Sequence, residues 1–312
     1  MMIDVGLIVS RFLHYFFVTM LAGVSMFPLY AYAAAEPIRL LRSRQTILLA
    51  AAVGALLSGL LWFLFSVANM SDALAGAIDP EIVWTVVQDT GFGHVWIARL
   101  ILSIITVGLI WNRFGSEFGP GRDLTTPVLA AVLLVSLAGV GHSQIDDGLA
   151  SIVPVVSDAA HLLAAGAWLG GLVPLGYLLM LHRRETGLVQ KGELNEILLR
   201  FSGMGYVAVA TLTGSGLINT WFLIGNVSGL FATPYGQLLI VKLVLFAGML
   251  ALAVLNRFWL VPSLTEGRED DRVGSTASTG TLRNHVLSEQ FLGLMVLLVV
   301  SVLGTMRPAI GQ

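Results

Sequence analysis

Long apolar runs alternate with short polar connections along most of the chain. Eight of these runs reach the length of about 20 residues that a helix needs to cross the hydrocarbon core of a bilayer. The runs lie near residues 5–33, 46–69, 93–114, 125–142, 154–181, 198–224, 236–262 and 285–306. The pattern predicts an all-α, polytopic membrane protein with eight transmembrane helices, of which the fourth is the shortest.

The basic residues are divided unevenly between the two sides that these spans define. The connections after spans one, three, five and seven, with their flanks, hold 13 of the 17 Lys and Arg residues, and the connections after spans two, four and six hold none. Because loops rich in Lys and Arg stay in the cytoplasm, we expect both termini to lie outside. In the longest outer connection, Asp79 and Pro80 predict a short interfacial helix over residues 80–88.

The composition agrees with a membrane protein and excludes several kinds of chemistry. Of the 312 residues, 56% are hydrophobic and 12% are charged, which leaves too little polar surface for a soluble globule of this size. The chain has no cysteine, so it has no disulfide, zinc–thiolate site or iron–sulfur cluster. The net charge of −2 and the lack of a basic array indicate no nucleic-acid partner. No phosphate loop, nucleotide-binding turn or serine nucleophile elbow is present, so we expect neither a primary pump nor an enzyme.

The two halves of the chain repeat a similar order of residues. Residues 9–14 align with residues 156–161 at an offset of 147. Because four spans separate the copies, both halves are expected to insert with the same orientation. The repeat predicts two parallel four-helix units, residues 1–150 and residues 151–312. Further downstream, at an offset of 143, the matched pairs are Gly93 with Gly236 and Arg99 with Lys242.

This alignment assigns equivalent positions to four polar residues of the first and fifth spans. His14 matches His161, and Arg11 matches Asp158. Arg11 and Asp158 carry opposite charges, so they are predicted to pair across the interface between the two units. Such a pair would lower the cost of burying both charges.

The fifth run carries ionisable side chains inside an otherwise apolar segment. Asp158 and His161 are three residues apart and Trp168 follows seven residues later, so all three share one face of a helix. The small residues around them allow neighbouring helices to approach closely. A carboxylate and an imidazole inside the membrane are costly to bury, and they therefore mark a candidate functional site. The alternative is a packing pair that only holds helices together.

Four of the six histidines fall toward the outer side of the predicted bundle. Neutral imidazole is the commonest protein ligand for metals such as copper, zinc and iron. The pattern predicts a metal site with His14 and His161 at its core, His94 and His142 near its entrance, and Asp158 as a ligand or an orienting partner. The alternative is that each histidine caps a helix or bonds a nearby carbonyl group. The residues expected to support the site are Arg11, Trp168, Arg99 and Lys242.

Several segments of the second half are similar to a known family. Residues 158–174, with the run from His161 to Leu172, resemble the signature helix of the copper-resistance protein D family of bacterial inner-membrane proteins. Further segments with the same likeness are Arg200–Ser202, Thr213–Gly214, Asn219, residues 233–242 and Asn256–Arg257. The likeness is specific from residue 154 to residue 306 and weaker over the first four spans.

The resemblance implies a role in copper homeostasis at the bacterial inner membrane, with both termini in the periplasm. It implies that copper, as Cu(I) or Cu(II), is bound and moved or handled there, and that a separate periplasmic copper-binding protein C is a possible partner. The family's signature histidine and tryptophan map to His161 and Trp168. Two alternatives stay open: a b-type haem redox protein with axial histidine ligands, and an assembly factor that helps to load metal into another protein.

Overall fold

The chain folds into a bundle of long helices. The computed structural model describes residues 1–33, 36, 38–115, 123–138, 152–184, 190–224, 227–262 and 272–311, and these residues form helices, turns and loops without a strand. Seven of the helical segments are long and apolar enough to cross a membrane. They span Met2–Ala31, Leu40–Met70, Gly91–Asn112, Ile152–His182, Gly192–Ile224, Pro234–Leu260 and Thr279–Leu303. The protein is therefore a polytopic, all-α membrane protein, as predicted.

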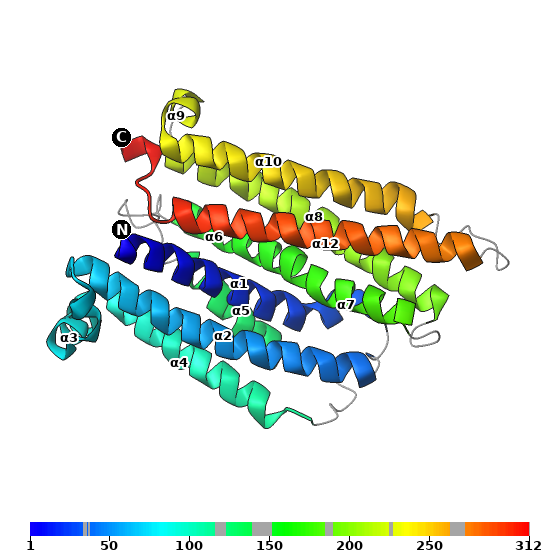
Figure 1. The fold of residues 1–312 in the computed structure, drawn as a ribbon, viewed down its shortest axis with the longest axis horizontal. Helices are drawn as coiled ribbons and strands as arrows, with labels where there is room; N and C mark the ends of the chain where they lie inside the picture. The colour runs from blue at the N-terminus through cyan, green and yellow to red at the C-terminus, as the bar shows by residue number, and fades with distance from the viewer. Residues whose placement is uncertain are drawn as a thin grey trace.

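The long helices are labelled in chain order in Figure 1. Two of the membrane-spanning segments contain a turn of π-helix: η5 joins α6 to α7, and η6 extends α10. The bounds are α1 Met2–Ala31, α2 Ile38–Met70, α4 Gly91–Asn112, α6 Ile152–Ala165, η5 Gly166–Gly170, α7 Gly171–Arg184, α8 Lys191–Ile224, α10 Pro234–Leu255, η6 Asn256–Leu260 and α12 Arg272–Leu303. Shorter elements are η1 Leu74–Ile78, α3 Pro80–Asp89, α5 Thr125–Val135, α9 Val227–Ala232 and η7 Ala309–Gly311.

Two of the predicted spans differ from the helices observed. The fourth corresponds to α5, whose 11 residues are about 16 Å long and too short to cross the hydrocarbon core. Residues 139–142 of that predicted span lie outside the described part of the chain, so the count of eight stays a prediction. The last helix, α12, begins at Arg272, well before the predicted start at residue 285.

Both ends of the chain lie at one end of the bundle, together with α3 and α9 (Figure 1). The short helix predicted over residues 80–88 is confirmed as α3, and its place at the membrane interface stays a prediction. The carboxylate of Asp79 caps it by accepting hydrogen bonds from the backbone N–H groups of Glu81 and Ile82, and Pro80 occupies its first turn. The acidic connection after the second span therefore contains an ordered helix at this end of the bundle.

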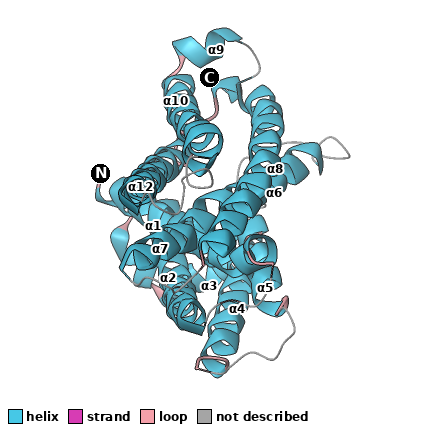
Figure 2. Cartoon of the chain, turned by 90° about the vertical axis from the view of Figure 1, so that its right-hand side faces the viewer, coloured by secondary structure: helices cyan, strands magenta, loops and turns pink. Residues whose placement is uncertain are grey.

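Helix α1 lies at the centre of the bundle. It packs against α2 and α5 of the first half and against η5, α7, α8 and α12 of the second half. The view in Figure 2 shows α1 between these two groups of helices. Because α1 touches both halves, its polar residues are placed where the halves meet.

A close crossing of two glycines brings α1 against the signature helix. A Cβ atom added to Gly23 would lie 2.3 Å from the Cα of Gly170, and one added to Gly170 would lie 2.4 Å from the carbonyl oxygen of Thr19. The two backbones therefore touch directly, as small residues allow in membrane helices. This confirms the predicted close approach around Trp168.

Candidate metal site

His14 is fully enclosed between α1, α2 and α4. It is 1% exposed. Its Nδ1 lies 3.1 Å from the carbonyl oxygen of Ala55 and 3.2 Å from Oγ of Ser58. Its Nε2 lies 2.6 Å from Nη2 of Arg99. A guanidinium can only donate, so Nε2 is the acceptor, and Nδ1 carries the proton of the neutral ring and donates to Ala55 and Ser58.

Two tryptophans and two arginines complete the surroundings of His14. The ring centroids of Trp62 and Trp96 lie 5.6 and 5.7 Å from the imidazole. Arg11 stands over Trp62 at 5.0 Å and Arg99 over Trp96 at 5.3 Å, both within cation–π range. This first-half centre is packed with aromatic rings, and Nε2 of His14 is occupied by Arg99.

His161 of α6 is anchored in the same way but its other nitrogen is open. Its Nδ1 lies 3.0 Å from Oγ of Ser215 on α8. The hydroxyl of Ser215 donates to the carbonyl of Thr211 at 2.5 Å, so it accepts from His161. Nδ1 therefore carries the proton, and Nε2 presents a lone pair that has no hydrogen-bond partner among the described residues.

Asp158 and Lys242 lie beside His161. Asp158 Oδ1 accepts a hydrogen bond from Nδ2 of Asn219 at 3.2 Å. Lys242 of α10 is close enough to Asp158 and His161 to interact electrostatically with both. In the described part of the chain, no carboxylate lies within 4.0 Å of the Lys242 ammonium. The His161 centre thus combines one open imidazole nitrogen with one carboxylate.

Tyr15 lies where the two centres meet. Its hydroxyl interacts electrostatically with Arg11 and Arg99 of the first half and with Asp158 of the second half. The predicted pairing of Arg11 with Asp158 is not formed. Arg11 Nε and Nη1 are buried without a hydrogen-bond partner in the described structure, and Asp158 bonds Asn219 instead. The stacking of Arg11 on Trp62 explains its position.

The contacts of the two centres are similar in kind. Each histidine donates from Nδ1 to a serine on the next long helix, and each serine precedes a glycine that faces the ring. A Cβ added at Gly59 would lie 3.1 Å from His14 Cε1, and one added at Gly216 would lie 3.8 Å from His161 Cε1. These likenesses support the two-repeat organisation, which stays a prediction.

The same likeness extends to the helices that carry the cations. Thr90 bonds back to Val86 O at 2.6 Å and caps Gly93 N at 2.9 Å. Thr233 bonds back to Gly229 O at 2.7 Å and caps Gly236 N at 3.0 Å. The two caps start α4 and α10 at matching points and place Arg99 and Lys242 at matching depths.

The other predicted site residues are not gathered around these histidines. His94 is exposed at the start of α4, and His142 lies outside the described residues. Trp168, 2% exposed, packs in the second-half core against Phe246. No group of three or more His, Cys, Asp or Glu side chains suited to a metal ion occurs within the part of the chain that the structure describes. No such group joins His14, His161 and Asp158 in the described residues, so their role as metal ligands stays a prediction.

Several contacting residues were not identified from the sequence. The anchoring serines, Ser58 and Ser215, each precede a glycine in the sequence, and this local pattern does not indicate a contact with an imidazole. Asn219 lies four residues after Ser215, just as Trp62 lies four residues after Ser58. The hydropathy pattern does not distinguish Asn219 from other polar residues of its helix. Tyr15 follows His14 directly, and in the sequence it cannot be distinguished from an aromatic residue that only packs in an apolar helix.

Three comparisons place the chain among known proteins. Residues 2–152 match the family model described as Copper resistance protein D-like, N-terminal domain, and residues 195–303 match Copper resistance protein D. Inner membrane protein YebZ of Escherichia coli (strain K12) is 28% identical over 305 residues, which are 96% of this chain and 98% of that protein. Copper resistance protein D of Pseudomonas syringae pv. tomato is 31% identical over 314 residues, with 96% of both chains covered.

A longer relative covers part of the chain. Copper transport protein CutJ of Bacillus subtilis (strain 168) is 33% identical over 196 residues, which are 61% of this chain and 34% of that protein. No solved structure matches. The coverage of both chains, the degree of identity and the two family models together show that the chain belongs to the copper resistance protein D family.

Proposed function

We propose that this protein acts in copper homeostasis at the bacterial inner membrane, where it binds copper at an intramembrane histidine site and passes it inward without nucleotide hydrolysis. The relatives include a copper resistance protein and a copper transport protein, and both family models concern copper resistance. The observation that carries the proposal is the open Nε2 of His161, beside Asp158 and oriented through Nδ1 by Ser215.

This arrangement has the form of a metal-binding imidazole. A ligating histidine usually donates its second ring N–H to an oxygen, which sets the tautomer and orients the lone pair toward the ion. His161 and His14 both do so through a serine. In the proposed site His161 is the first ligand and Asp158 the second. His14 joins them when Arg99 leaves its Nε2.

The charged side chains around His14 and His161 influence which oxidation state of copper the proposed site prefers. Arg11, Arg99 and Lys242 are cationic and Asp158 is the acid among them, which gives a local charge of three minus one, or +2, with neutral histidines. Bringing a divalent ion beside this charge in a low dielectric costs more than bringing a monovalent one. We therefore propose Cu(I) as the preferred cargo, with His94 and His142 near the entrance on the periplasmic side.

The haem alternative has weaker support. Axial ligation by His14 and His161 would need both Nε2 atoms to be free on opposite faces of a macrocycle. Arg99 occupies Nε2 of His14, and Trp62 and Trp96 pack against that ring. A purified protein without a Soret band is the expected result. An assembly factor that receives copper from a periplasmic copper-binding protein would share the site and differ only in showing no flux across vesicles.

The experiment measures copper binding and cellular copper in matched histidine variants. The full-length protein in lipid nanodiscs is titrated with Cu(I) against a competing chelator, as wild type, His161→Ala, His14→Ala and the double variant. We expect His161→Ala to weaken binding by at least about 100-fold, since a ligand is lost, while His182→Ala, at the other end of the same membrane span, leaves it unchanged. Unaltered copper affinity and cellular copper content in the double variant would overturn the proposal.

A further inference from the structure

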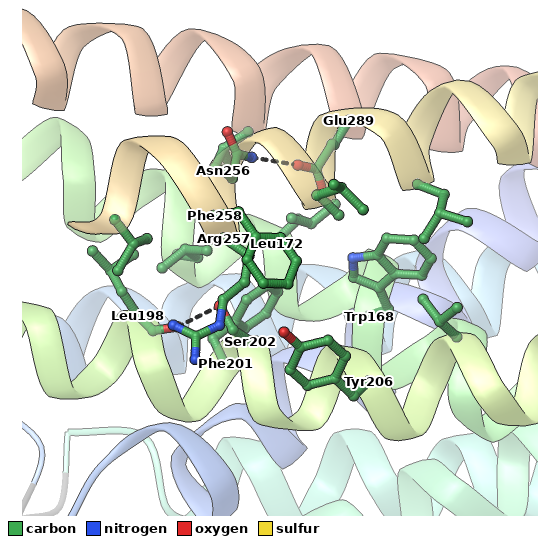
Figure 3. A pocket seen from close by; sticks show the side chains of 18 of the residues that line it. Trp168, Leu172, Leu198, Phe201, Ser202, Tyr206, Asn256, Arg257, Phe258 and Glu289 are labelled. Carbon is green, nitrogen blue, oxygen red and sulfur yellow. Dashed lines mark hydrogen bonds between the residues drawn. The ribbon is translucent and has the colours of Figure 1, made fainter. Parts of the chain in front are cut away.

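A cavity lies in the second half of the bundle, with Trp168, Tyr206, Arg257 and Glu289 among the side chains around it (Figure 3). It encloses about 250 Å³ and is bounded by α8, by the end of α10 with η6, and by η5, α7 and α12. Helix α8 packs mainly on α6, whereas α10 packs on α12. The cavity therefore fills the space between two helix pairs that do not close on each other.

The walls of this cavity are largely apolar. Six of the side chains that line it are Leu175, Leu198, Phe201, Leu250, Phe258 and Val261. Protein interiors are close-packed, so a void of this size is unusual. Apolar cavities of about 150 Å³ stay free of water and bind small apolar molecules. An apolar occupant is therefore favoured here.

The rim of the cavity faces the bilayer. Tyr206 on α8 is 53% exposed, and Val254 and Phe258 on the opposite side are 46% and 59% exposed. In a membrane-spanning bundle, exposed apolar side chains of this kind contact lipid. The occupant can therefore enter sideways from the membrane, which favours a lipid acyl chain.

Arg257 supplies a cation at one end of the cavity. It lies in η6, three residues before the end of its membrane span at Leu260, close to the membrane surface. Its Nε is buried without a hydrogen-bond partner, and no carboxylate of the described residues forms an ion pair with it. A guanidinium in this position binds phosphate oxygens well, because it offers several donors in a planar fork.

Glu289 does not turn the cavity into a cation site. It is 2% exposed. Its Oε1 accepts a hydrogen bond from Asn256 Nδ2 at 2.6 Å, and the Trp168 indole also interacts with it. Asn256 in turn accepts from Nδ1 of His285 at 2.8 Å. The carboxylate is thus directed at protein donors, and Arg257 is the charged group of the cavity that has no ion-pair partner among the described residues.

We propose that this cavity binds one anionic phospholipid, with an acyl chain between α8 and α10 and the phosphate on Arg257. Basic pockets between transmembrane helices near the membrane surface recognise such headgroups. The bound chain would restore packing between the two helix pairs. This inference does not rest on copper binding, because the cavity shares no residue with the His14 and His161 centres.

The test uses native mass spectrometry of the full-length protein in detergent, titrated with phosphatidylglycerol or phosphatidylcholine. We expect one phosphatidylglycerol to be retained by the wild type and phosphatidylcholine to bind far more weakly. Arg257→Gln should lower phosphatidylglycerol retention about tenfold, because charge-assisted hydrogen bonds are lost. Arg283→Gln, at a partly exposed cation on α12 that does not line the cavity, is the control for charge.

Two glycines of α8 provide a matched test of the cavity itself. A Cβ added at Gly205 or at Gly203 would meet no atom within 4 Å, and Gly205 lines the cavity whereas Gly203 does not. We expect Gly205→Phe to abolish lipid retention and Gly203→Phe to preserve it. Equal retention of both lipids, equal behaviour of the two glycine variants, or displacement of the lipid by inorganic phosphate alone would overturn the proposal.

Discussion

Nη2 of Arg99 donates a hydrogen bond to Nε2 of His14 at 2.6 Å, and this contact occupies the only ring lone pair of that neutral histidine. Arg99 is itself 2% exposed. It is held by the carbonyl of Leu133 at 3.0 Å and by the hydroxyl of Ser136. On the proposed function, Arg99 therefore competes with copper for His14. At the matching position, Lys242 leaves Nε2 of His161 open.

Replacing Arg99 by leucine should strengthen copper binding. Leucine cannot donate to Nε2, cannot bind copper and carries no charge, so a charge-assisted hydrogen bond no longer has to be broken, a gain of about 10-fold or more in affinity. The measurement is chelator competition for Cu(I). The double variant Arg99→Leu with His14→Ala should lose this gain. Unchanged or weaker binding in a folded Arg99→Leu protein would show that His14 is not a ligand.

Removing the hydroxyl that orients His161 should weaken copper binding without removing a ligand. Ser215→Ala deletes the acceptor of the Nδ1 proton, and the loss of such an orienting partner typically costs about 10- to 100-fold in metal affinity. Ser202→Ala is the matched control, because Ser202 lies on the same helix and bonds only the carbonyl of Leu198 on its own helix. Equal affinities for the two variants would count against His161 as the ligand.

His94 should affect copper uptake more than copper affinity. Its exposed position at the start of α4 separates it from the deep centres. We expect His94→Ala to change the dissociation constant by less than about twofold, which is within the range expected for a surface substitution, while cellular copper accumulates more slowly. A large loss of affinity would place His94 in the binding site itself.

The glycine crossing between α1 and η5 should be intolerant of a methyl group. In Gly170→Ala the new Cβ would lie 2.4 Å from the carbonyl oxygen of Thr19, so the helices must separate, at a cost of about 1–3 kcal/mol or more. In Gly108→Ala on α4 the Cβ meets nothing within 4 Å, so no destabilisation is expected. Thermal unfolding in detergent compares the two. Equal melting temperatures would contradict the direct backbone contact.

The ion pair at the start of α5 should make stability depend on pH. Burial raises the pKa of Asp123, but hydrogen bonds from Arg113, from the Thr126 hydroxyl and from the Thr125 backbone N–H outweigh it and lower the pKa below its ordinary 3.8. A lowered folded pKa gives stability that is present above the unfolded pKa and lost as the pH falls through the folded pKa.

Asp123→Asn should accordingly lower the melting temperature at pH 7, with a free-energy loss of up to about 1 kcal/mol from the weakened ion pair with Arg113. The difference from wild type should shrink once the pH is taken below about 4. Asp89→Asn, at an exposed position at the end of α3, serves as the control. A difference between Asp123→Asn and wild type that is the same at pH 7 and at low pH would show that the charge of Asp123 does not contribute.

The hydrophobic pattern determined the fold class because membrane burial acts on every residue of a span. Apolar runs of spanning length exclude a soluble fold, and the caps at Asp79, Thr90 and Thr233 are local, so sequence positions alone specify where α3, α4 and α10 begin. The depth of His14 and His161 follows from their distance along each span. The hydrophobic runs, the local caps and the position of each histidine along its span depend only on the order of residues, so they can be derived from the sequence.

Only the tertiary structure decided which nitrogen of each histidine is available. That choice depends on whether a residue on another helix donates a hydrogen bond to Nε2: Arg99 donates to His14, whereas Lys242 does not donate to His161. Side-chain contacts between helices leave no periodic signal in the sequence. The same reason explains why the predicted pairing of Arg11 with Asp158 is not formed. Helix packing places Arg11 over the ring of Trp62, and it places Asp158 where it accepts a hydrogen bond from Asn219.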